Sequence, residues 1–133
     1  MPKRETSIRQ GLVLFAKNKK RVSIFYQQTL GLGIIEQQSS HDLLHGNGIE
    51  IVVHAIPKKI AAEIDMTEPP NIREDMPFKP TFVVADLEAV RASAEKTGGH
   101  LKPIEDAWHI QGAGVIDGWD PEGNVVQFKQ YGR

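Results

Sequence analysis

The predicted order of secondary structure in the first half of the chain recurs in the second half, and this repeat limits the fold more than any other feature of the sequence. Asn18 and Asp86 are both helix-capping residues, and each follows a short apolar run typical of a strand. The helix-like segments after them end at matching glycines, Gly31 and Gly99. A duplicated order is stronger evidence than a single segment, so the chain is predicted to contain two copies of one unit.

Each unit is predicted to have the order β-α-β-β-β. In the first unit, residues 9–56, apolar residues spaced three and four apart predict one helix from Lys19 to Leu30. Short β-branched segments separated by polar or glycine-rich turns predict its strands at 11–16, 34–38, 42–45 and 49–55. In the second unit, residues 79–131, a helix after the capping aspartate joins strands predicted at 79–85, 101–104, 113–119 and 124–131.

A proline-rich connector, residues 57–78, separates the two units. Its prolines and mixed charges are typical of irregular structure, with room for one helical turn at 60–64. A chain of 133 residues has the usual size of one compact domain. We therefore predict a single α+β domain, residues 1–133, built from the two units and the connector.

The segment Asp120-Pro-Glu-Gly-Asn124 is predicted to form the turn before the last strand. Pro121 supplies the fixed φ of the second turn position, and Gly123 can take the positive φ that follows. Beyond the turn, alternation places Val126 and Phe128 on one face of the strand and Gln127 on the other.

Charge balance and residue usage exclude several classes of partner. The net charge of −1 gives no bulk attraction to nucleic acid. No apolar run is long enough to span a membrane, and the start of the chain does not have the pattern of a secretory signal. The chain contains no cysteine, which excludes disulfides and thiolate metal sites and fits a reducing compartment. We expect a cytoplasmic protein.

Two segments carry a resemblance to a known superfamily. They are Phe25-Tyr-Gln-Gln-Thr-Leu-Gly-Leu32, in and after the first predicted helix, and Asp120-Pro-Glu-Gly-Asn-Val-Val-Gln127, at the last turn. With the two β-α-β-β-β units, they make residues 9–131 similar to the vicinal oxygen chelate superfamily, which includes glyoxalase I, bleomycin-resistance proteins, fosfomycin-modifying enzymes and extradiol dioxygenases. The resemblance implies two βαβββ modules that form a cupped mixed sheet. It does not fix the function, because this fold hosts many chemistries.

In that superfamily a divalent metal is held in the cup by one residue on the first strand and a Glu on the last strand of each module. The last-strand positions match Glu50 and Gln127, and the first-strand positions, counted back from the capping residues, match Gly11 and Lys79. Glycine has no side chain and a protonated lysine has no lone pair, so neither can be a ligand. Glu50 alone is a strong candidate, and one carboxylate would bind a divalent metal only weakly. We therefore expect no cofactor and no tightly held metal.

We hypothesise that the Lys79 ammonium lies near Glu50 and supplies the positive charge that a metal would otherwise supply. The alternative is that Lys79 extends into solvent and pairs with nothing. Alternation along the strand 49–55 places His54 on the same face as Glu50 and Val52. His54 is either a general base or ligand contact, or a partly exposed residue at a strand end.

Apolar and aromatic residues complete the predicted ligand site. Val13 and Phe15 alternate with helix-facing residues, and they would line the cup together with Val52. The resemblance places Trp108 and His109 near its mouth, where an aromatic wall can stack on a ligand. Trp119 is expected to be structural, as large aromatic residues usually are.

Two other segments have a chemical interpretation. Arg73 in the connector is either part of a lid that faces an anionic ligand or part of a solvated surface. His41-Asp-Leu-Leu-His45 resembles the zinc-binding pattern H-E-x-x-H. The segment is too short for a stable helix, and in a strand the two histidines lie too far apart to share a metal.

The first hypothesis for function is a cytoplasmic homodimer that binds a small organic molecule in the cup, with no nucleic acid or membrane partner. If it is an enzyme, lyase or isomerase chemistry is expected, with His54 or Glu50 as the base and Lys79 or Gln127 stabilising negative charge. The second hypothesis is sequestration of a drug-like compound, as in the bleomycin-resistance branch. The third is a metal-dependent glyoxalase-type or dioxygenase-type enzyme, with Glu50, Gln127 and His54 as ligands. The homodimer follows from the resemblance alone.

Overall fold

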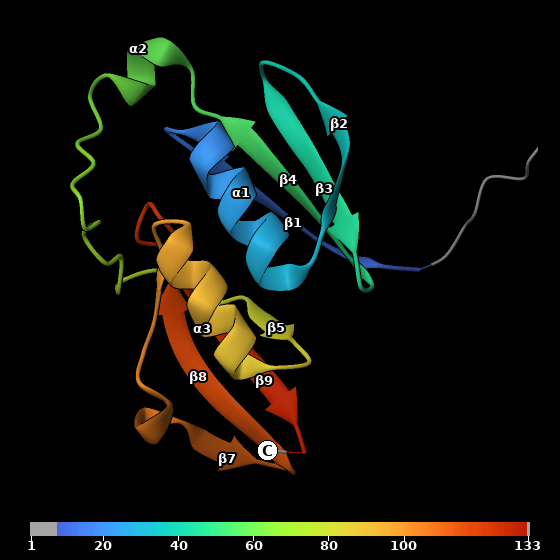
Figure 1. Ribbon diagram of the computed structural model, residues 1–133. Helices are drawn as coiled ribbons and strands as arrows, with labels where there is room; N and C mark the ends of the chain where they lie inside the picture. Colours follow the sequence, from blue (N-terminus) through green and yellow to red (C-terminus); the bar gives the residue numbers. More distant parts are fainter. Residues whose placement is uncertain (1–7, 133) are drawn as a thin grey trace, which may run out of the picture.

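The computed structural model describes residues 8–132 and shows the two predicted βαβββ modules (Figure 1). The first module consists of β1 Gln10–Ala16, α1 Lys19–Leu30, β2 Gly33–Gln37, β3 His41–Gly46 and β4 Ile49–Ala55. The second consists of β5 Thr81–Val83, α3 Leu87–Lys96, β6 His100–Leu101, β7 Trp108–Ile110, β8 Ala113–Trp119 and β9 Val125–Tyr131. The connector contains one short helix, α2 Lys58–Ala61, and a 3-10 turn, Ile104–Asp106, precedes β7.

The two sheets have the same strand order, β1-β4-β3-β2 in the first module and β5-β9-β8-β6 in the second. The first and last strands of each module pair in parallel, as the helical crossover between them allows, and the other pairs are antiparallel. Strand β7 was not predicted. Both β6 and β7 pair with β8. In the first module the equivalent strand, β2, is continuous, whereas in the second module Pro103 and the 3-10 turn interrupt it and leave two short strands, β6 and β7.

The predicted capping residues begin both helices. Asn18 accepts a hydrogen bond from the backbone N–H of Arg21 at 3.1 Å, and Asp86 accepts one from that of Glu88 at 2.9 Å. Gly31 ends α1 in the left-handed conformation, with φ of 67°, which favours glycine. The helices α1 and α3 lie side by side on the same side of the two sheets (Figure 1).

A hydrophobic core continues from one module into the other. The rings of Phe25 and Tyr26 in α1 are buried edge to face, with centroids 4.9 Å apart, and Tyr26 also meets Phe82 of β5 at 6.1 Å. Phe25 packs so closely on the second module that a Cβ atom at Gly99 would overlap its ring. Phe128 of β9 faces this core, as alternation predicts.

The predicted turn at Asp120–Asn124 joins β8 to β9 and fastens the first module to the second. The Asp120 carboxylate is fully buried and accepts hydrogen bonds at Oδ1 from the backbone N–H groups of Glu122 and Asn124, at 2.9 and 3.1 Å. Its Oδ2 accepts from the Tyr26 hydroxyl at 2.8 Å and from the Asn124 side chain at 2.9 Å. The Glu122 carboxylate, 3 % exposed, accepts from the two backbone N–H groups just before α1, at 2.9 and 2.7 Å. We call Tyr26, Asp120, Glu122 and Asn124 the inter-module anchor.

Burial changes the acidity of two anchor groups. It raises the pKa of the Asp120 carboxyl above its ordinary value, although the hydrogen bonds from Asn124, Tyr26 and Glu122 act in the opposite direction. The pKa of Tyr26 is raised well above its ordinary value, first by burial and then by the negative charge of Asp120. Tyr26 is therefore a hydroxyl donor at neutral pH.

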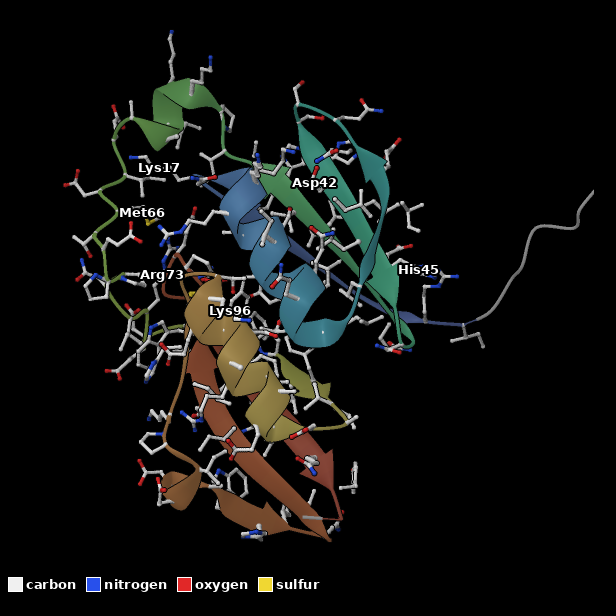
Figure 2. The ribbon with its side chains drawn as sticks, viewed as in Figure 1. Lys17, Asp42, His45, Met66, Arg73 and Lys96 are labelled. Carbon is white, nitrogen blue, oxygen red and sulfur yellow. The ribbon has the colours of Figure 1, made fainter. Side chains whose placement is uncertain are left out.

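The connector runs along the outside of the molecule from β4 to β5 and is tied to the same turn (Figure 1). The Arg73 backbone N–H donates to the carbonyl of Gly123 at 2.8 Å, and its Nε donates to the carbonyl of Glu122 at 3.2 Å. The guanidinium also lies 4.0 Å from the sulfur of Met66, its neighbour in the connector (Figure 2). Among residues 8–132, no helix is both long and apolar enough to cross a membrane.

Candidate functional site

The cup consists of the sheet faces that point away from the helices. In the first sheet, β1 and β4 bring three pairs of residues together on this face: Gly11 with Glu50, Val13 with Val52, and Phe15 with His54. These residues share one face, as alternation predicts. Val13 and Phe15 are each 58 % exposed, which leaves apolar surface open to solvent.

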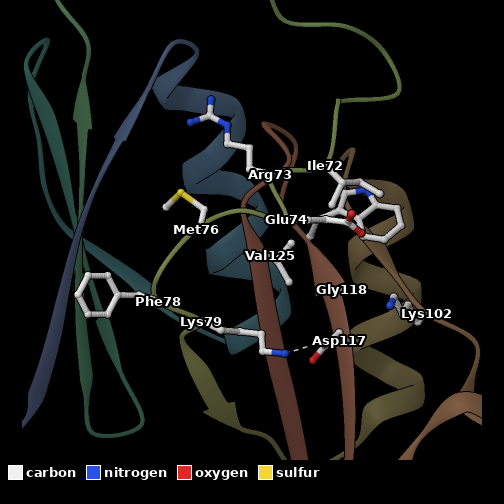
Figure 3. Close-up of a pocket in the computed structure, with 11 residues that line it drawn as sticks. Ile72, Arg73, Glu74, Met76, Phe78, Lys79, Lys102, Asp117, Gly118 and Val125 are labelled. Carbon is white, nitrogen blue, oxygen red and sulfur yellow. Dashed lines mark hydrogen bonds and ion pairs between the residues drawn. The ribbon is translucent and has the colours of Figure 1, made fainter.

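A chain of hydrogen bonds crosses the corresponding face of the second sheet. The Thr81 hydroxyl donates to Gln127 Oε1 at 3.0 Å, and Gln127 Nε2 donates to Asp117 Oδ1 at 3.2 Å. Lys79 Nζ donates to the other carboxylate oxygen, Asp117 Oδ2, at 2.9 Å (Figure 3). These contacts orient the Gln127 amide and engage both oxygens of Asp117. We call Lys79, Thr81, Asp117 and Gln127 the polar row.

Neither alternative for Lys79 holds, because its ammonium forms no ion pair with Glu50 and does not extend unpaired into solvent. The Lys79 ammonium pairs with Asp117 in its own module, and Glu50 pairs with Arg9 at a distance of 3.7 Å. Asp117 reaches the polar row because β8 and β9 place it directly opposite Gln127. That register depends on how the strands pair, which the alternation of one strand does not reveal.

The first-strand metal position of the second module also differs from the predicted one. Strand pairing places Thr81 opposite Gln127 in the same way that it places Gly11 opposite Glu50. Thr81, and not Lys79, is therefore the equivalent position. Counting back from the capping residues fails because the stretch between this position and the helix is shorter in the second module.

The four equivalent positions do not fit a divalent metal. Gly11 has no side chain, the Thr81 hydroxyl is neutral and bonded to Gln127, and the Glu50 carboxylate pairs with Arg9. Two neutral oxygens and one carboxylate supply too little negative charge for a tight site. In the described part of the chain, no three His, Asp or Glu side chains are arranged to hold a metal ion.

His54 lies in a small cluster at one end of the first sheet. Its Nδ1 is 3.0 Å from a backbone carbonyl, and its ring lies 5.4 Å from that of Phe15 and 6.2 Å from that of His41. His41 Nε2 is hydrogen-bonded to Glu36 at 2.7 Å. Residues 41–45 lie in β3, so the resemblance to a zinc helix is excluded as expected. Sequence reasoning missed Glu36, because a bulge in β2 shifts its alternation.

Two adjoining cavities lie on either side of the end of the connector: the larger is formed by the connector and the second module, and the smaller lies between the two modules. One has a volume of about 450 Å³ and is bordered by Lys79 and Asp117 of the polar row (Figure 3). Trp119 borders the same cavity. The other has a volume of about 350 Å³ and is mainly apolar, with Val13 and Phe15 of β1 in its wall. Four residues border both cavities: Arg73, Met76, Phe78 and Val125.

The aromatic residues are distributed differently from the prediction. Trp108 and His109 lie in β7 and border neither of these two cavities, so their ligand role stays a prediction. Trp119, expected to be structural, borders the larger cavity, and its ring packs on that of His100 at 4.7 Å. Sequence reasoning missed Phe78, because only the path of the connector places it between the sheets.

Comparison with solved structures identifies the fold. A glyoxalase/bleomycin resistance protein/dioxygenase family enzyme from Burkholderia phytofirmans PsJN matches with a TM-score of 0.63 and 22 % identity, over 90 % of this chain and 95 % of that chain. A glyoxalase/bleomycin resistance protein from Albidiferax ferrireducens T118 matches with a TM-score of 0.64 and 16 % identity, over 92 % of this chain and 97 % of that chain. A virulence protein from Salmonella typhimurium matches with a TM-score of 0.59 and 17 % identity, over 97 % and 99 %. No protein-family model and no curated protein sequence matches the chain.

The fold is therefore that of the glyoxalase/bleomycin resistance/dioxygenase proteins. The fold predicted from the sequence is confirmed. Within that fold, this chain places Gly11 opposite Glu50 and Thr81 opposite Gln127 at the four central positions. At these identities the likeness shows the fold alone, and one fold can host many functions.

Proposed function

We propose that this protein binds a small organic molecule in the two adjoining cavities, without a tightly held metal. The observation that carries the proposal is the pair of cavities itself, of about 450 and 350 Å³. Both volumes lie within the range of small-molecule sites, which combine apolar walls with a few oriented polar groups. The polar row supplies such groups in the larger cavity, because its hydrogen bonds hold Lys79 and Asp117 in place.

Exposed apolar side chains support the same proposal. Phe78 is 79 % exposed although it borders both cavities, and Val13, Phe15 and Met76 beside it are also exposed. A ligand that covered this surface would gain about 25 cal/mol for each Å² of apolar area removed from water. Clustered apolar surface at a cavity is typical of binding sites, whereas single exposed apolar residues are ordinary.

The geometry favours binding over acid–base catalysis. Glu50 and His54, the predicted bases, border neither of the two cavities. Asp117 borders the larger one, but it accepts hydrogen bonds at both oxygens. Lyase or isomerase chemistry, with Lys79 or Gln127 stabilising negative charge, would need a ligand that extends from the cavities along the first sheet. Sequestration of an organic compound needs only the cavities.

Two measurements test the proposal. The neutral fluorescent probe N-phenyl-1-naphthylamine should bind the wild type, and Phe78→Ala should weaken that binding because it removes a wall shared by both cavities. Equal binding by the two proteins would contradict the proposed location. In thermal-shift experiments, Ni²⁺, Mn²⁺, Zn²⁺ and Fe²⁺ should shift the Tm of the wild type no more than that of Glu50→Ala. Stoichiometric metal in the purified protein that is lost in Glu50→Ala would overturn the metal-free site.

The proposal also includes the location and assembly of the protein. The absence of cysteine from the sequence supports a cytoplasmic location, because thiol-free chains fit a reducing compartment. The fold supports a homodimer only through the resemblance to its superfamily.

A further inference from the structure

We infer that the ligand is an organic anion, with an apolar body in the smaller cavity and a carboxylate or sulfonate group bound by Lys79. This inference rests on the proposed function and names the class of ligand. It follows from three features: the side chains of the last two connector residues, the exposure of the Lys79 ammonium, and the charges around the larger cavity.

The end of the connector presents an apolar and a cationic side chain in two consecutive residues. The Phe78 ring points toward β1 in the first sheet, and the Lys79 side chain points toward Asp117 in the second (Figure 3). Because the two residues are consecutive, the backbone keeps the ring and the ammonium close to each other while they face different sheets. Phe78 borders both cavities, whereas Lys79 borders only the larger one. A short ligand can therefore contact the ring and the ammonium together.

The ammonium of Lys79 is more accessible to a ligand than the carboxylate of Asp117. Both oxygens of Asp117 accept hydrogen bonds within the polar row, and its side chain is 23 % exposed. The Lys79 side chain is 43 % exposed, and an ammonium carries three N–H donors, of which Asp117 takes one. Two donors remain for an anionic group, which forms stronger hydrogen bonds with an ammonium than a neutral group does.

The charges around the larger cavity also favour an anionic ligand. Its border contains two acidic residues, Glu74 and Asp117, and three basic residues, Arg73, Lys79 and Lys102. The formal balance at the cavity is positive, although the whole chain has a net charge of −1. A cationic ligand would meet this excess of positive charge, whereas an organic anion would neutralise it.

A pair of matched fluorescent probes tests the inference. The two probes, 8-anilinonaphthalene-1-sulfonate and N-phenyl-1-naphthylamine, share an apolar body and differ in one sulfonate group. Lys79→Gln should weaken binding of the sulfonate probe about tenfold, the usual effect of one lost charge-assisted hydrogen bond, and leave the neutral probe unchanged. Lys79→Arg, which keeps the charge, should retain most of the sulfonate affinity. The control Lys58→Gln, in exposed α2 away from both cavities, should affect neither probe.

Each outcome has a separate meaning. Equal weakening of both probes by Lys79→Gln, in a variant that melts like the wild type, would show that the side chain acts through shape, and would overturn the inference. No change for either probe would also overturn it, while the proposed function would stand. If neither probe binds the wild type, the proposed function fails and the inference fails with it. If Lys79→Gln does not fold, a wild type that binds the sulfonate probe no more tightly than the neutral probe overturns the inference.

Discussion

Replacing Tyr26 with phenylalanine removes a single hydroxyl group from the inter-module anchor. This hydroxyl donates to Asp120 Oδ2 at 2.8 Å, both groups are buried, and the other three donors to the carboxylate remain. A hydrogen bond to a charged group contributes about 1.5–3 kcal/mol to stability. We expect Tyr26→Phe to lower the free energy of unfolding by that amount, and the Tm by roughly 5–12 °C for a domain of this size.

Urea unfolding followed by tryptophan fluorescence measures this loss. The chain offers a matched control, because its only other tyrosine, Tyr131, is 56 % exposed and lies at the end of β9. Tyr131→Phe removes the same atom from the surface and should change the free energy of unfolding by no more than about 0.5 kcal/mol. If Tyr26→Phe proves as stable as Tyr131→Phe, the buried hydroxyl does not hold the modules together and the reasoning is refuted.

Two further predictions concern the same turn. Because burial raises the pKa of Asp120, the native state binds the carboxyl proton more tightly than the unfolded chain does. The stability that this proton contributes is lost as pH rises from about 4, near the pKa of the unfolded chain, toward the raised pKa of the native state. Asp120→Asn cannot titrate, so urea unfolding should show a larger stability difference between wild type and variant at pH 4 than at pH 7; a larger difference at pH 7 would contradict the direction of the shift. Gly123 has φ of 83°, and a Cβ there would overlap the carbonyl of Asn71. Thermal melts should show that Gly123→Ala costs at least twice the roughly 1 kcal/mol expected for Gly112→Ala, which has φ of 78° and open space around it; similar losses would show that the connector yields easily.

Local patterns were sufficient to predict most of the fold. Asn18 and Asp86 begin the two helices because a side-chain oxygen at that position satisfies free N–H groups, which is a short-range effect that the sequence displays directly. The turn at 120–124 is equally local, since proline and glycine set its backbone angles. The repeat of the β-α-β-β-β order in the second half of the chain then restricts how the strands can be connected. Strand β7 escaped prediction because three residues are too few for an alternation pattern to stand out.

The site was harder to predict because it depends on which strands pair and in what register. Counting along the chain correctly placed Gly11 opposite Glu50 but placed Lys79 where the structure has Thr81. A difference of this kind keeps the side chain on the same face, so alternation cannot detect it. The partner of Lys79, Asp117, belongs to a strand whose neighbours only the folded sheet defines.

The residues that stabilise the fold are different from the residues that line the cup, so the fold does not depend on the chemistry of the cup. Asp120 is buried and makes four hydrogen bonds, so almost any replacement would leave donors unsatisfied. Gly11 is exposed in the cup, and a Cβ there would meet only the carbonyl of Glu50 at an ordinary 3.5 Å. The fold therefore does not require glycine at Gly11, and substitution at such exposed positions costs little stability. Cup residues such as Gly11 and Thr81 can thus differ from the metal-binding pattern while the anchor preserves the modules, so the chemistry of the cup can change without loss of the fold.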